Sequence, residues 1–225
     1  MSKRPTCPHC LRPQLACLCG CIRRVHSLVQ VLVLQHPLEV GHAKNTARLL
    51  HLCLPNSRLE VAEQADASTL HAWLHAPWQG QAADTIVHPV LLYPPTPDDP
   101  QLPLQPAPPL PAPWLTQPQQ LRLVILDGTW RKSRKMLYLN PGLQQLPRLA
   151  LTQLPHGRYA IRKAHAPHQL SSFEAAICAL AQLQGWEATH PALEQLTLSF
   201  NAAMAWHQDL QAQHQVTSTP PVCRT

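Results

Sequence analysis

The sequence predicts an α/β fold, a sheet with flanking helices, preceded by a small cysteine-rich segment. Three observations support this. Short apolar runs typical of buried strands alternate with helical patterns. The 225 residues suffice for one full core, or for one domain with a small appendage. Five of the eight cysteines lie between positions 7 and 21. We therefore expect a cysteine-rich knuckle at residues 1–24 and an α/β domain at residues 25–214.

The knuckle carries a Cys-x-x-Cys pair, and a second close cysteine pair follows it. Two such pairs let four thiolates surround one tetrahedral zinc ion. In a reducing compartment a tight cluster is more often a metal site than a disulfide framework, and free thiols or a redox pair are the alternatives. With four thiolates and no water position, such a zinc would be structural. The predicted ligands are Cys7, Cys10, Cys17 and Cys19, and Cys21 could replace either of the last two.

The first part of the domain alternates strands and helices. A continuous apolar run predicts a buried strand over residues 29–34, and it ends in Gln35-His36-Pro37. Leu49, Leu50 and Leu52 indicate a helix over residues 43–53, which the following Pro55 ends. Further strands are expected at residues 58–62 and 87–93, with a helical region around Leu70, Trp73 and Leu74 between them.

Residues 94–118 contain 11 of the 25 prolines. Proline lacks a backbone donor, so this stretch fits neither a helix nor a central strand. We expect a surface insertion. A structureless loop of this length is otherwise typical of a disordered segment or a functional lid.

The second part of the domain begins with a buried strand over residues 123–126, followed by a helix. Short strands are expected at residues 149–151 and 159–161. Ser171 and Glu174 form a capping-box pattern that opens a helix over residues 175–183. A last helix is expected over residues 191–213, and residues 215–225 should be a disordered tail.

The strand at 123–126 ends in Asp127, Gly128, Thr129 and Trp130, and four cations follow within five residues. Ligands of open α/β sheets bind beyond the carboxyl ends of the strands. An acid and an indole at this edge, beside a positive patch, indicate chemistry on a small molecule next to a polyanion. A solvated charged face, with Trp130 as a core anchor, is the plainer alternative. The four cations are Arg131, Lys132, Arg134 and Lys135.

Two further segments also place polar or cationic residues at expected strand ends. His36-Pro37-Leu38-Glu39 ends the first strand, and Lys44-Asn45-Thr46 opens the next helix, whose N–H groups suit an anionic or carboxylate ligand. An ordinary strand–helix connection is the alternative. Arg162 and Lys163, followed by His165, add cations at another expected strand end. Glu174 is expected to cap its helix first and to contact a ligand only secondarily.

The charge and the termini restrict the class of protein. Eighteen Lys and Arg against twelve Asp and Glu give a net charge of +6, which suggests an anionic partner. No apolar stretch reaches the roughly 18 residues of a membrane span, and no hydrophobic region follows the first cations. We expect a soluble, cytoplasmic protein without a membrane partner. The sequence makes no prediction of its oligomeric state.

Four motifs together resemble the DTW-domain proteins, specifically the bacterial tRNA-uridine aminocarboxypropyltransferases, over nearly the whole chain. They are the cysteine knuckle, the His36–Thr46 segment, the Asp127–Lys135 segment and the Arg162–His165 segment. The namesake Asp-x-Trp pattern corresponds to Asp127–Trp130. The resemblance implies an α/β fold related to the SPOUT methyltransferases, with a C-terminal trefoil knot as the cofactor cradle. The chain departs from the family at Ser172-Phe173, where a Thr-Leu-like pair is expected, and in the proline-rich insertion. We expect the first departure to affect only the helix cap.

The resemblance also implies the reaction. The 3-amino-3-carboxypropyl (acp) group of S-adenosylmethionine moves to N3 of a tRNA uridine, position 47 in the variable loop, and methylthioadenosine is released. S-adenosylmethionine is the co-substrate and tRNA the partner. Alternatives are a SPOUT-like RNA methyltransferase and a zinc-bearing RNA-binding protein without activity. A ribosomal-RNA acp-transferase is a third, against which the cysteine knuckle argues.

The site residues follow from the matching motifs. Asp127 is either the base that deprotonates the uridine imide or an anchor for the cofactor, because a strand-end acid can be partly desolvated. Trp130 would stack on adenine or on the flipped uridine. The expected cofactor-binding residues are His36, Pro37, Glu39, Asn45, Thr46, Asp127, Gly128, Thr129, Arg162, Lys163 and Ser171. The expected tRNA-phosphate contacts are Arg131, Lys132, Arg134, Lys135, Arg162 and Lys163.

Overall fold

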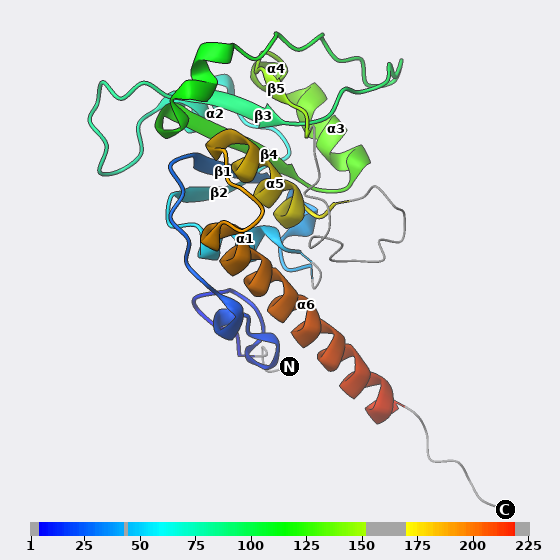
Figure 1. The fold of residues 1–225 in the computed structure, drawn as a ribbon. Coiled ribbons are helices and arrows are strands. Elements are labelled where there is room, and N and C mark those ends of the chain that lie inside the picture. The colour runs from blue at the N-terminus through cyan, green and yellow to red at the C-terminus, as the bar shows by residue number, and fades with distance from the viewer. Residues whose placement is uncertain (1–4, 43–44, 152–169, 219–225) are drawn as a thin grey trace, which may run out of the picture.

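The computed structural model describes residues 5–42, 45–151 and 170–218. In this part of the chain a five-stranded, fully parallel sheet has the strand order β2-β1-β4-β3-β5, which confirms the α/β class (Figure 1). The strands are β1 (Gln30–Gln35), β2 (Ser57–Val61), β3 (His88–Leu92), β4 (Leu121–Asp127) and β5 (Arg148–Leu149).

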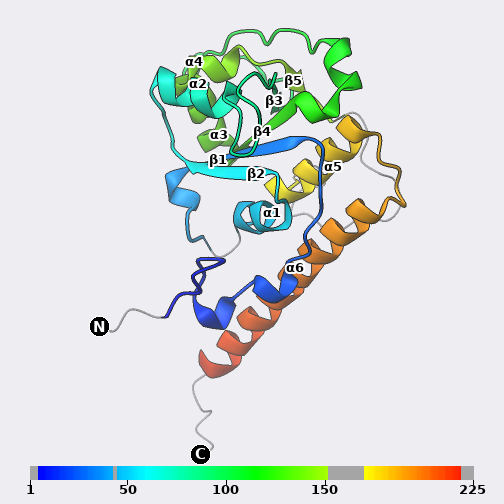
Figure 2. The same ribbon diagram turned by 90° about the vertical axis from the view of Figure 1, so that its left-hand side faces the viewer.

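Helices cover both faces of the sheet (Figures 1 and 2). One face carries α1 (Ala47–Cys53), α5 (Ser172–Gln184) and α6 (Pro191–Ser218), and the other carries α2 (Ala67–His75), α3 (Trp130–Leu139) and α4 (Pro141–Gln144). Short 3₁₀ turns complete the described elements. These are η1 (Gln14–Ala16), η2 (Cys19–Cys21), η3 (Pro37–Glu39), η4 (Ala112–Thr116) and η5 (Pro118–Gln120).

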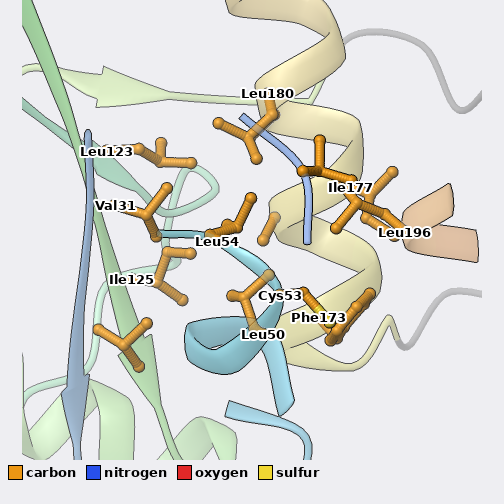
Figure 3. Packing of buried hydrophobic residues seen from close by; sticks show 14 of the residues in the cluster. Val31, Leu50, Cys53, Leu54, Leu123, Ile125, Phe173, Ile177, Leu180 and Leu196 are labelled. Atoms are coloured by element: carbon orange, nitrogen blue, oxygen red, sulfur yellow. The ribbon is translucent and has the colours of Figure 1, made fainter. Parts of the chain in front are cut away.

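The central strands divide their side chains between two cores. Val31 and Leu123 point toward α1 and α5, into a core that also contains Phe173 and Ile177 of α5 (Figure 3). Their neighbours in sequence, such as Leu32, point to the other face and pack with α2, α3 and α4. Since both faces are covered, the central strands are apolar throughout, which is why they could be identified as continuous apolar runs.

Several boundaries differ from those predicted. The first helix begins at Ala47, so Asn45 and Thr46 precede it. The strand expected at residues 149–151 is Arg148–Leu149. The last helix continues through Ser218, so the tail predicted from residue 215 was placed too early. The strand expected at residues 159–161 lies outside the described residues.

The proline-rich segment 94–118 is a surface insertion attached to the domain by several contacts. Trp114 stacks on His88 with ring centroids 4.2 Å apart. The Gln105 N–H donates to Gln144 Oε1 at 2.8 Å. Two backbone carbonyls of segment 94–118 also accept hydrogen bonds from Arg134. The segment lies at the surface, as expected, and these contacts, together with the 3₁₀ turn η4, give it a defined path. That it is an insertion stays a prediction.

Two expectations about the fold stay predictions. They are the relation to the SPOUT methyltransferases and the C-terminal trefoil knot. Among the described helices, none combines the length and apolar character that crossing a membrane requires.

Candidate active site

The site lies at the carboxyl ends of β1 and β4. These neighbouring parallel strands are in register, so that Gln35 and Asp127, their last residues, lie side by side. The chain leaves β1 toward α1 on one face, and it leaves β4 toward α3 on the other. Connections that diverge in this way open a crevice at the sheet edge, where α/β proteins bind their ligands.

Asp127 is the centre of a hydrogen-bond network at this edge, and its side chain is buried, with 5% of the residue exposed. Gln35 Nε2 and Asn45 Nδ2 donate to its Oδ2 at 2.9 and 2.6 Å. Ser172 Oγ donates to its Oδ1 at 2.7 Å. Three neutral donors from β1, from the residues before α1 and from α5 therefore fix this carboxylate.

The network leaves the two carboxylate oxygens different. An ionised carboxylate oxygen has two lone pairs in its plane. Both lone pairs of Asp127 Oδ2 are used, whereas Oδ1 accepts one bond, from Ser172, among the described residues. Oδ1 is therefore the atom that can accept a hydrogen bond from a bound molecule.

Trp130 begins α3 and exposes 55% of its surface, so the alternative of a core anchor is wrong. The ring meets Tyr93 edge-on, with centroids 5.8 Å apart, which leaves indole surface open for stacking. Thr129 caps the helix by accepting from the Lys132 N–H at 3.4 Å. A Cβ on Gly128 would lie 3.2 Å from Lys132 Cβ, so this turn has little room for a larger residue.

His36 joins the loop after β1 to the acid Glu63. Its Nδ1 accepts from the Leu38 N–H at 3.1 Å, so the proton lies on Nε2, which donates to Glu63 Oε1 at 3.0 Å. Lys135 contacts the same oxygen at 2.9 Å. The Lys135 ammonium and the His36 imidazole hold the pKa of Glu63 below its usual range. The buried His36 thus connects the loop after β1, through Glu63, to Lys135 on α3.

Most of the four cations of α3 have acidic partners. Lys132 pairs with Glu39 at 2.7 Å, and Arg134 pairs with Asp99 at 3.4 Å. Lys135 pairs with Glu63, as described above. Within the described chain, Arg131 is the cation of this group whose side chain has no ion pair or hydrogen bond, and it is exposed. The patch is therefore less open to phosphates than the sequence suggests.

The structure brings together only part of the predicted cofactor set. Pro37 opens η3 beside the site, and Thr46 is buried just before α1. Ser171 is engaged in the capping box with Glu174, as predicted for the helix start. Arg162 and Lys163 lie outside the described residues.

Sequence reasoning missed two residues that hold Asp127. Gln35 is the polar end of an apolar strand, and the register of β1 with β4, which no local sequence pattern encodes, places it beside Asp127. Ser172 was expected to affect only the helix cap, and that expectation was wrong. It lies at the first turn of α5, where its hydroxyl reaches the carboxylate while Ser171 caps the helix.

A cavity of about 280 Å³ opens beside Asn45, between the cysteine-rich segment, α1 and α6. Its walls are mostly apolar and include Leu18 and Leu49, with Trp206 on the α6 side. Asn45 and Thr46, two of the predicted cofactor-binding residues, line it. Its size is close to the lower end of small-molecule sites, roughly 300 Å³.

The cysteine knuckle places the four predicted ligand atoms together. The sulfurs of Cys7, Cys10, Cys17 and Cys19 all lie within 4.8 Å of one another. The pairs Cys7–Cys19 and Cys10–Cys17 are each 3.7 Å apart. A tetrahedron with metal–sulfur bonds of about 2.3 Å has edges of about 3.8 Å. The four thiolates can therefore bind a metal ion, and Cys21 lies outside the cluster.

The knuckle is also integrated with the rest of the molecule. Backbone N–H groups of Cys10 and His9 lower the pKa of the Cys7 thiol to about 6, whereas burial and the neighbouring thiols raise the pKa of Cys19. Cys10 and Cys21 belong to the core shared by α1, α5 and α6, and Figure 2 shows the segment lying along α6.

Comparison with known proteins gives consistent matches. The model of the DTW domain family matches residues 4–205. Proteins named tRNA-uridine aminocarboxypropyltransferase 2 are similar: that of Macaca fascicularis is 25% identical over 194 residues, and that of Mus musculus 27% over 195. Each alignment covers 81% of this chain and 57% of the relative. The Drosophila melanogaster protein of that name is 26% identical over 191 residues, with 81% and 68% covered.

The chain thus spans little more than half the length of the two mammalian relatives. These relatives are animal proteins, so the resemblance to the bacterial enzymes in particular stays a prediction. No solved structure gives a significant match. Because the family model extends from the cysteine knuckle to α6, the chain belongs to the DTW domain family.

Proposed function

We propose that this protein transfers the 3-amino-3-carboxypropyl group of S-adenosylmethionine to N3 of a tRNA uridine, with release of methylthioadenosine. The observation that carries the proposal is the buried carboxylate of Asp127, which three donors fix and whose Oδ1 accepts one bond among the described residues. It ends the strand that leads into the exposed Trp130. The names of the relatives support this reaction and this class of substrate.

S-adenosylmethionine supplies an activated electrophile, because its sulfonium makes the acp group transferable. The residues present fit such a co-substrate: Asp127 Oδ1 can accept from an ammonium or hydroxyl group, and the open indole of Trp130 can stack on a flat base. Asn45 and Thr46 line the neighbouring cavity.

The protein has two tasks toward the uridine. Its N3–H must be oriented toward the transferred carbon, and it must lose its proton. The fixed Asp127 Oδ1 suits both an N–H acceptor and a base. The rigid network favours positioning as the larger contribution, since the electrophile is already activated.

The tRNA would be held by stacking and by cations. We propose that Trp130 stacks on the uridine or on the adenine, and that Arg131 contacts phosphate because it is exposed and unpaired in the described chain. Lys132, Arg134 and Lys135 would contact RNA only by leaving their acidic partners. We propose the same phosphate-binding role for Arg162 and Lys163, which lie outside the described residues.

Finer assignments belong to the same proposal. Uridine 47 of the variable loop is the proposed target, and structural zinc is the proposed metal in the four-cysteine cluster. A cytoplasmic location suits a tRNA substrate.

The test is the small-molecule product formed from S-adenosylmethionine and bulk tRNA by the purified protein. Methylthioadenosine is the expected product. S-adenosylhomocysteine would instead identify an RNA methyltransferase, and tRNA binding without either product would identify a non-catalytic RNA-binding protein.

A further inference from the structure

We infer that Arg12, which lies within the cysteine knuckle, is a positioning residue for the active site. It acts through Asn45, so the metal-binding segment helps to hold the carboxylate of Asp127 in place. This inference rests on the proposed function, in which Asp127 contacts the reacting molecules.

Two consecutive hydrogen bonds connect the knuckle to Asp127. Arg12 Nη2 donates to the backbone oxygen of Asn45 at 2.7 Å. The side chain of Asn45 then donates from Nδ2 to Asp127 Oδ2 at 2.6 Å. The knuckle and the carboxylate are therefore separated by one residue, Asn45.

Asn45 uses both ends of its amide, so its orientation is defined. Oδ1 accepts from the Ala47 N–H at 3.0 Å, which turns Nδ2 toward Asp127. Asn45 lies just before Thr46, the residue that precedes α1, and residues 43–44 before it are not described. The guanidinium of Arg12 holds the backbone carbonyl of Asn45, and a charged donor makes this a strong hydrogen bond.

The position of Arg12 is in turn set by the knuckle. Its backbone oxygen accepts from the N–H of Cys7 at 2.8 Å, and the Leu11 N–H bonds to the oxygen of Cys7 at 2.9 Å. Leu11 has a φ of 59°, as a tight turn between the two cysteine pairs requires. A metal bound by Cys7 and Cys10 would fix this turn and therefore the base of the Arg12 side chain.

A second arginine offers a matched control. Arg48, on α1, donates from Nη2 to the backbone oxygen of His9 at 2.9 Å. It also joins the knuckle to α1 through a guanidinium–carbonyl bond, but within the described part of the chain its partner His9 makes no hydrogen bond to Asn45 or Asp127. Removing Arg48 should weaken docking of the knuckle without disturbing the carboxylate.

The experiment compares Arg12→Ala and Arg48→Ala in the full, metal-loaded chain. Both variants should lose a similar amount of thermal stability. Arg12→Ala should lower kcat about 10-fold with little change in the KM for tRNA, whereas Arg48→Ala should keep kcat within about 2-fold. A rise in the KM for tRNA with unchanged kcat, restored by Arg12→Lys, would instead identify a phosphate contact and overturn the inference.

A double-mutant cycle tests whether Arg12 acts through Asn45. In an Asn45→Ala background, Arg12→Ala should have almost no further effect on kcat, because the path to Asp127 is already broken. Independent, additive losses would contradict the inference.

Hydrogen exchange gives a readout that does not depend on activity. The Ala47 amide should exchange faster in Arg12→Ala than in Arg48→Ala, since its acceptor on Asn45 is less restrained. Equal exchange in the two variants would overturn the positioning role even if the protein proved to have another activity. A wild-type protein without transferase activity, but with this exchange difference, would instead refute the proposed function alone.

Discussion

Ser172 Oγ donates a hydrogen bond to Asp127 Oδ1 at 2.7 Å, although 45 residues separate the two in the chain. The contact ties the first turn of α5 to the end of β4. It also determines which part of the carboxylate remains available, because the remaining acceptor position on Oδ1 is the one that a bound molecule can use.

The first prediction concerns this contact. Ser172→Ala should lower kcat/KM about 10-fold, equivalent to about 1.4 kcal/mol, because Asp127 loses one of three restraints. The matched control is Ser199→Ala, because Ser199 is buried on α6 and its hydroxyl accepts from the Arg23 N–H at 3.0 Å. That variant should lower stability by about 1–3 kcal/mol while kcat stays unchanged. Steady-state kinetics and urea unfolding of both variants check this, and equal activity losses would refute the assignment.

The second prediction concerns the metal. Purified protein should contain about one zinc per chain, and chelation should lower its melting temperature. Cys7→Ser should reduce the zinc content strongly, whereas Cys21→Ser should retain it, since Cys21 lies outside the four-sulfur cluster. Metal analysis decides the matter. Zinc lost equally from both variants, or stability unaffected by chelation, would rule out this ligand set.

The third prediction separates the cations of α3. Arg131→Ala should weaken tRNA binding and reduce the slope of log affinity against log salt by about one, as expected for one phosphate contact. Arg134→Ala should change binding less, because Arg134 already pairs with Asp99 and with two carbonyls of segment 94–118. It should instead make that segment more sensitive to protease. Binding titrations at several salt concentrations test this, and a larger effect of Arg134→Ala on affinity would contradict it.

The fourth prediction concerns pH. Burial, reinforced by the nearby Arg48 charge, lowers the pKa of His51, and burial also lowers that of His75. The unfolded chain therefore takes up protons near pH 6.5 while these folded imidazoles stay neutral. The stability that they contribute is present above that pH and is lost as pH falls from about 7 to 5. His51→Gln should flatten this dependence in urea unfolding, and an unchanged slope would contradict it.

Much of the site could be predicted from local sequence. Buried parallel strands are apolar on both faces, so β1 and β4 were recognisable, and the polar residues after them were expected at one edge of the sheet. The spacing of the cysteines identified the four-sulfur cluster that can bind a metal ion, because two close pairs suffice for a tetrahedral shell.

The remaining features depend on contacts between distant segments. The register of β1 with β4 places Gln35 beside Asp127 across 92 residues, and no local pattern encodes that pairing. Arg12 contacts Asn45 across 33 residues through the folded knuckle. The acids that neutralise the α3 cations lie on separate loops, so a charged run could not reveal how much of its charge is already paired.

The most direct test of the account is mass spectrometry of a single reaction containing S-adenosylmethionine, tRNA and either the wild-type protein or Asp127→Asn. The wild type should form acp-modified uridine and methylthioadenosine in equal amounts, and Asp127→Asn should bind tRNA but lose most of both products. Methylated tRNA with S-adenosylhomocysteine, or full activity in Asp127→Asn, would contradict the central claim.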